Sequence, residues 1–172
     1  MKLPTKVRID LLEFLRTGHF DCLRLGQTQE YILHNFPDPD DFDASWLTDP
    51  RSSRLSIWRY GNVELHFEGP RLFLVFSDYL DSLTGGPSLD IDPWILARPE
   101  PVGLLDVIRE LNRERIDFCK ERGSVGIVVV RLSSGVTLHF DPGDPPDVGV
   151  ADPNEYRLSA FALQAAPNRR EP

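Results

Sequence analysis

Apolar and polar residues alternate along two stretches of the chain, which is the pattern of half-buried β-strands. In the first stretch, runs over 54–60 and 63–67 flank Gly61-Asn62, a dipeptide that favours a two-residue hairpin turn. Glu68-Gly69-Pro70 then turns the chain into a third run, so we predict a three-stranded antiparallel meander over 54–80. Runs over 126–132, 136–140 and 156–163 predict a second meander.

Apolar residues spaced three and four positions apart predict three helices. The first is predicted over 5–16, between a Thr5 cap and Gly18, and the second between Thr28 and Pro37. The longest is predicted over 103–122, with Glu110 on its solvated side. Pro, Gly and Asp favour an exposed loop over 37–43, a linker of little regular structure over 81–100 and a frayed tail over 167–172. The apolar side of the longest helix is predicted to carry Leu104, Leu105, Ile108, Leu111 and Phe118.

The two meanders align as an internal repeat. Residues 54–67 run without a gap over 127–140, at an offset of 73 residues, and both halves follow the order helix, strand, strand, strand. We therefore predict an α+β fold in which residues 1–172 form a single domain. Two tandem repeats, about 24–80 and 101–163, each with a helix and an antiparallel three-stranded meander, would form one sheet backed by helices.

The chain is acidic, and this charge narrows the classes of partner. Its 172 residues hold 19 Lys and Arg against 27 Asp and Glu, a formal net charge of −8, with no concentrated basic run. Such a chain repels phosphate backbones and anionic membranes, so we expect neither nucleic acid nor a lipid surface as a partner. A basic protein is favoured instead.

The two cysteines and the N-terminal residues indicate the compartment. Cys22 and Cys119 belong to no CxxC pair or Cys/His cluster, which excludes a zinc ribbon and a thioredoxin-like site and predicts two buried thiols. The first fifteen residues carry scattered charges where a signal peptide needs an apolar core. We expect a reducing, cytoplasmic environment, while a disulfide between the two cysteines stays open.

Three segments of the first half carry a family resemblance: residues 25–30 (LGQTQE), 36–39 (FPDP) and 58–67 (WRYGNVELHF). They resemble the module of the bacterial β-lactamase inhibitor protein and SmpA/OmlA-like families, although Phe36 stands where those families have glycine. In tandem members the resemblance implies two modules whose continuous sheet grips another protein with its concave face. The secreted inhibitors have a signal peptide and two disulfides, whereas the first fifteen residues here predict no signal peptide and two cysteines cannot form two disulfides, so a cytoplasmic target is expected rather than a β-lactamase.

Two groups of side chains are candidates for binding that target. If Ile57 and the apolar residues of 63–67 face the helices, Trp58 and Tyr60 lie on the open sheet face, where aromatic residues among polar ones form a binding hot spot. The alternative is that a loop, for instance one carrying Trp94, covers them. Acidic loop residues would form a rim that steers a basic partner, or would simply form turns. The predicted partner-binding residues are Trp58, Tyr60, Glu64, His66, Asp38, Asp40, Asp41 and Asp43.

The sequence contains no catalytic signature. The nucleophile elbow, the phosphate-binding loop and the dinucleotide-binding glycine pattern are all missing. We therefore predict a non-enzymatic protein without a cofactor, most plausibly an immunity protein that neutralises a bacterial toxin. One alternative is a small-ligand or metal-dependent enzyme, because His66 and His139 could meet on one sheet face with Glu64 as a third ligand. Another is a homodimeric scaffold formed through the sheet edge.

Overall fold

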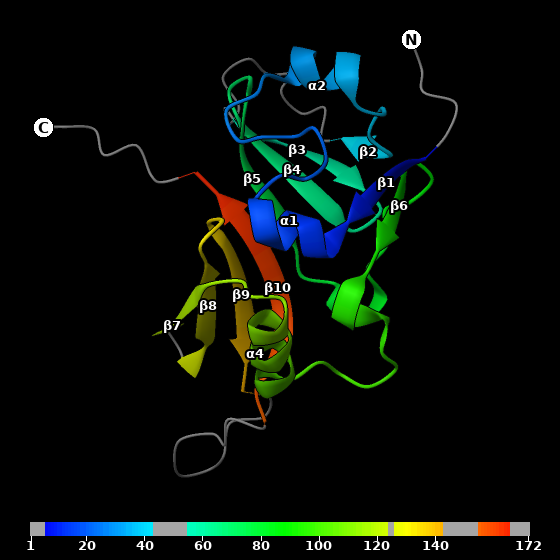
Figure 1. Ribbon diagram of the computed structural model, residues 1–172. Helices are drawn as coiled ribbons and strands as arrows, with labels where there is room; N and C mark the ends of the chain where they lie inside the picture. The colour runs from blue at the N-terminus through cyan, green and yellow to red at the C-terminus, as the bar shows by residue number, and fades with distance from the viewer. Residues whose placement is uncertain (1–5, 43–54, 124–125, 143–154, 166–172) are drawn as a thin grey trace, which may run out of the picture.

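A computed structural model describes residues 6–42, 55–123, 126–142 and 155–165 of the chain. It confirms the α+β fold, built on a single eight-stranded antiparallel sheet in the order β2-β3-β4-β5-β10-β9-β8-β7 (Figure 1). The strands of this sheet are β2 Asp41–Phe42, β3 Leu55–Tyr60, β4 Val63–Glu68, β5 Arg71–Ser77, β7 Phe118–Arg122, β8 Val128–Leu132, β9 Val136–Asp141 and β10 Arg157–Gln164.

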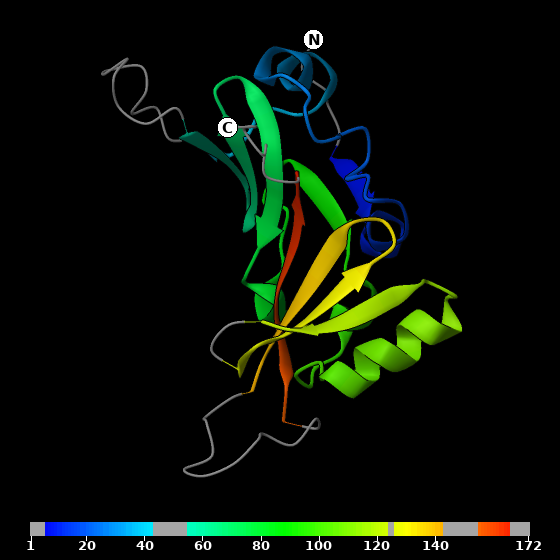
Figure 2. The same cartoon turned by 90° about the vertical axis from the view of Figure 1, so that its left-hand side faces the viewer.

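Helices cover one face of this sheet. The helices are α1 Leu11–Thr17, α2 Gln29–Asn35 and α4 Leu104–Arg113. Two 3-10 turns complete the set: η1 Leu80–Ser82 follows β5, and η2 Trp94–Ala97 lies later, before α4. In Figure 2, α1 and α4 both lie to the right of the sheet, and the described residues place no α-helix on its left side. The core lies between the two layers, where strand residues such as Leu65, Phe67 and Phe140 meet Phe14 and Leu111.

The sheet consists of two halves with the same order of elements. Each half has a helix followed by four strands, α2 with β2–β5 and α4 with β7–β10, and the halves join through antiparallel pairing of β5 with β10. The predicted repeat of one helix and three strands is thus one strand short in each half. The missing strands are the outermost ones, of which β2 has only two residues.

The gap-free alignment of the two hairpins is wrong by one residue. In the first hairpin Tyr60 pairs with Val63 across a two-residue turn. In the second, Arg131 pairs with Thr137, and the strands extend one residue further to Leu132 and Val136, which leaves the three residues 133–135 in the turn. Strands β4 and β9 therefore correspond at the predicted offset, but β3 and β8 correspond one residue earlier. Because successive strand residues point to opposite faces, this shift exchanges the two faces of β3.

The N-terminal helix begins later than predicted. Residues Val7–Asp10 form strand β1, which pairs in parallel with β6, Leu89–Asp92. The N-cap of α1 is Asp10, whose side chain accepts a hydrogen bond from the Glu13 amide, and Gly18 ends the helix in the left-handed conformation at φ 71°. Thr5, the predicted cap, lies outside the described residues. Local apolar spacing favours a longer helix, but pairing with residues 82 positions away in the sequence decides the structure here.

The longest predicted helix also divides into two elements. Helix α4 ends at Arg113, Arg115 takes a left-handed φ of 55°, and the chain continues as edge strand β7. Phe118 is therefore a strand residue. Glu110, predicted to be solvated, is buried with 7% exposure and pairs with Arg113 at 2.6 Å and Arg98 at 3.6 Å, while Leu105 is exposed. The buried residues of α4 are Leu104, Val107, Glu110 and Leu111.

The linker over 81–100 is more ordered than its proline content suggests, because it contains β6 and η2. Cys119 is exposed and Cys22 is half-buried, so the prediction of two buried thiols fails for Cys119; both are free. The predicted tail over 167–172 lies outside the described residues. Among the residues that the structure places, no helix combines the length and apolarity needed to cross a membrane.

Candidate functional site

The aromatic pair predicted for the binding surface lies in the core instead. In an antiparallel pair, directly opposed residues share a face, and Trp58 opposes Leu65 while Tyr60 opposes Val63. Trp58 is 6% exposed and Tyr60 is fully buried. The Tyr60 hydroxyl donates to the Pro37 carbonyl at 2.8 Å, and burial raises the pKa of this phenol. The two-residue turn Gly61-Asn62 already requires this register, so the signal was present in the sequence.

The opposite face of the sheet is the candidate site, and we call it the open face. It carries the outward side chains of β3–β5 and β7–β10, and no helix among the described residues covers it (Figure 2). Most of these side chains are partly buried by their neighbours across the strands. The apolar and aromatic members are Ile57, Phe73, Leu74, Phe76, Val129 and Ala162, and the polar members include Arg59, Glu64, His66, Cys119, Glu121, Arg131, Thr137 and His139.

A chain of ionic contacts crosses the first half of the open face. Arg59 Nε donates to Glu64 Oε1 at 3.1 Å and Arg59 Nη1 contacts Asp41 Oδ2 at 3.2 Å, while His66 Nε2 lies 2.8 Å from Glu64 Oε2. Burial alone would raise the pKa of Glu64, but the hydrogen bonds from Arg59 and His66 lower it below its ordinary value. His66 packs edge-on against Phe73, with ring centroids 6.2 Å apart. These contacts link Arg59, Glu64 and His66 into one network on the open face.

The second half of the open face contains a shallow depression of about 360 Å³. Arg131 makes two hydrogen bonds to the carboxylate of Glu121, at 3.2 and 3.4 Å, and these lower the pKa of that carboxyl. Thr137 Oγ1 lies 3.1 Å from His139 Nε2, and burial lowers the pKa of His139. Leu74, Phe76, Val129 and Ala162 contribute the apolar part of the lining.

The structure separates the three residues of the predicted metal site. His66 and His139 share the open face, but β5 and β10 lie between their strands. Three strand spacings of about 4.8 Å place them roughly 14 Å apart, which is too far for one ion. Only Glu64 and His66 are in contact. The described part of the chain contains no group of three or more His, Cys, Asp or Glu residues that could hold a metal.

The acidic loop residues have different environments. Asp40 is structural: Oδ2 accepts from the Gly61 amide at 2.6 Å and Oδ1 accepts from the Ser88 hydroxyl at 2.9 Å. Gly61, at φ 59°, lies so close to the backbone of Thr84 that a side chain would not fit there. Asp41 is exposed and pairs with Arg59, Asp38 is exposed, and Asp43 lies outside the described residues. Among the described rim residues, Asp38 and Asp41 therefore stay candidates for steering a partner, while Asp40 ties the hairpin turn to residues 84–88.

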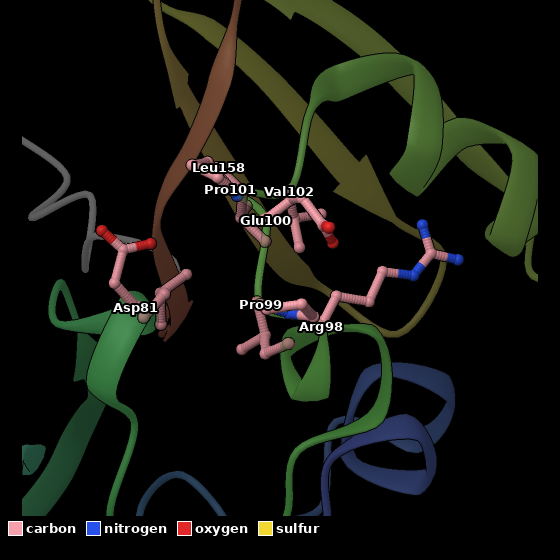
Figure 3. A pocket seen from close by; sticks show the side chains of 9 residues that line it. Asp81, Arg98, Pro99, Glu100, Pro101, Val102 and Leu158 are labelled. Carbon is pink, nitrogen blue, oxygen red and sulfur yellow. The ribbon is translucent and has the colours of Figure 1, made fainter.

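A second hollow lies between the 3-10 turns and β10, and Figure 3 shows it from close by. Asp81 stands on one side and Glu100 on the other, whereas Arg98 extends away toward α4, where it pairs with Glu110. At about 110 Å³ the hollow is far below the roughly 300 Å³ at which small-molecule sites begin. It is therefore a weaker candidate than the open face.

The chain was compared with protein-family models, with curated proteins and with solved structures, and none of the three comparisons found a match. The resemblance to the β-lactamase inhibitor and SmpA/OmlA-like families accordingly stays a prediction. The open face is therefore the feature of the molecule that points to a function.

Proposed function

We propose that this protein is a non-enzymatic binding protein that holds another protein against its open face. The observation that carries the proposal is that helices cover only one face of the eight-stranded sheet in the described part of the chain. Helices bury one face, while Ile57, Phe76 and Val129 are only partly buried on the other. Apolar and aromatic side chains framed by fixed polar groups are typical of protein interfaces.

Charge supports a basic partner. By strand register the outward carboxylates of the sheet are Glu64, Glu68, Glu121 and Asp141, with Asp41 beside them, and the outward cations are Arg59, Arg71, Arg131 and Arg157. The sheet face alone is therefore close to balance, and the acidic bias comes from the chain as a whole. The whole chain adds a formal net charge of −8. Such a field raises the rate at which a basic protein associates, and the effect weakens with salt.

The specific role that we propose is immunity, in which a cytoplasmic protein neutralises a basic bacterial toxin. An inhibitor needs a large surface rather than a catalytic cavity, and the eight-stranded sheet offers such a surface, with polar side chains linked by the Arg59–Glu64–His66 contacts. A toxin-like reading frame beside the gene would support this role.

Site-specific photo-crosslinking tests the proposal. Benzoylphenylalanine is placed in the full chain at position 57 or 129 on the open face, or at Leu33 or Leu105 on the helical side as matched exposed controls. Each protein is produced and irradiated in the source organism. We expect one basic protein to be crosslinked from positions 57 and 129 and not from the controls. Crosslinking mainly from the controls, or a product made only of two copies of this chain, would contradict the proposal.

A further inference from the structure

The depression on the open face exists because one strand contributes a small side chain between larger ones. Ala162 on β10 pairs with Phe76 on β5 and with Thr137 on β9, so a methyl group lies between an aromatic ring and a branched side chain. Gly135, at the nearby turn, adds no side chain to the rim. The result is a hollow of about 360 Å³ whose lining includes the apolar side chains of Leu74, Phe76, Val129 and Ala162.

The charges at the rim of the depression balance. Glu121 and Arg131 neutralise each other through two hydrogen bonds, and burial favours the neutral form of His139. A charged side chain entering the depression would find no opposite charge free to pair with it. An uncharged side chain with a large apolar surface is therefore the better occupant.

The hydrogen bonds of Thr137 also define a polar group at the depression. Thr137 Oγ1 donates its single hydrogen to the Ala162 carbonyl at 3.2 Å, so the contact with His139 requires His139 Nε2 to be the donor. The neutral ring then has Nδ1 as an acceptor. An entering group that carries a hydrogen-bond donor would satisfy this acceptor.

We propose that the depression is the anchor pocket for a tryptophan or tyrosine side chain of the basic partner. This rests on the proposed function, because it names the residue by which the partner is held. Tryptophan and tyrosine combine a broad apolar ring with one donor, and both are enriched among residues that dominate binding energy. Glu64, which opposes the lining residue Phe76, and Asp141, two residues beyond the lining residue His139 on β9, lie next to the depression and would contact Lys or Arg residues beside that aromatic ring.

Short peptides test the anchor without the partner. The ¹⁵N-labelled full chain is titrated with acetyl-Lys-Trp-Lys-amide, and with the Tyr, Phe and Ala versions as controls. We expect dissociation constants on the order of 1 mM for the Trp and Tyr peptides. Binding should be at least threefold weaker for Phe, which lacks the donor, and absent for Ala. The shifted amides should centre on Val129, Thr137 and Ala162.

Two variants locate the binding. Ala162→Leu fills the depression and should weaken binding of the Trp peptide at least fivefold, while Ile57→Leu, elsewhere on the open face, should change it less than twofold. If Ala162→Leu does not fold, Thr137→Val serves instead: it removes the hydrogen bond that fixes His139 and should abolish the preference for Trp and Tyr over Phe.

Three results would overturn the anchor: no shifts at 10 mM peptide, shifts centred on Arg59 and His66, or equal binding by wild type and Ala162→Leu. Crosslinking from position 57 would still decide the proposed function separately.

Discussion

Replacing Trp58 by alanine tests whether this residue belongs to the core or to a binding surface. Its ring is 6% exposed and packs against Phe67, with centroids 4.6 Å apart. Truncation removes the whole indole from a packed core, which costs about 3–5 kcal/mol in such sites. For a domain of this size each kcal/mol lowers the melting temperature by roughly 2–4 °C, so we expect a loss on the order of 10 °C.

The neighbouring position provides the matched control. Ile57 pairs with His66 on the open face and is only partly buried, so Ile57→Ala should cost about 1 kcal/mol or less. Urea denaturation of both variants, followed by circular dichroism, measures the two free energies of unfolding. The register is refuted if Trp58→Ala costs less than about 1 kcal/mol, or if Ile57→Ala is the more damaging of the two.

Three further predictions concern stability. Asp40→Asn removes a charge-assisted hydrogen-bond acceptor and should lower the free energy of unfolding by about 1–2 kcal/mol. Asp41→Asn loses only an exposed ion pair and should lower it by less than about 0.5 kcal/mol. Thermal unfolding measures both, and equal losses of stability would refute a structural role for Asp40. Ser77 is fully buried and its Oγ has no hydrogen-bond partner among the described residues, so Ser77→Ala should stabilise by about 1 kcal/mol, while Ser56→Ala, which removes the acceptor for Gln29, should destabilise. The folded state lowers the pKa of His139, so the unfolded chain binds the proton first as pH falls below the ordinary value of 6.5, and stability is lost there. Between pH 7 and pH 5, urea titrations should show a smaller loss of unfolding free energy for His139→Gln than for wild type. An equal loss in the two proteins would contradict the burial of this ring.

Much of the fold follows from short-range patterns. Alternation located the strands of both hairpins, and Thr28 caps α2 as predicted, its hydroxyl accepting from the Tyr31 amide at 3.2 Å. What local patterns could not supply was pairing between distant segments. Strand β1 exists because residues 89–92 lie beside it, and β7 exists because β8 offers it a partner. From apolar spacing alone, both segments are predicted to be helical.

The candidate site was located on the correct face of β4 but with the wrong residues of β3. Glu64 and His66 lie on the open face as predicted, whereas Trp58 and Tyr60 exchange places with Ile57 and Arg59. The gap-free alignment favoured this error, because it aligned Ile57 with the core residue Val130 and ignored the extra residue in the second turn. Hairpin register, applied from the turn outward, would have given the correct face.

The central claim is that the open face holds the partner, and arginine substitutions test it most directly. Ile57→Arg and Leu105→Arg each place a charged side chain at a surface position, one on the open face and one on the helical side. The partner identified by crosslinking is purified on its own, and isothermal titration calorimetry measures its affinity for each variant. We predict at least tenfold weaker binding for Ile57→Arg and less than twofold change for Leu105→Arg, with melting temperatures of both near wild type. Unchanged affinity for Ile57→Arg, or a greater loss for Leu105→Arg, would contradict the account.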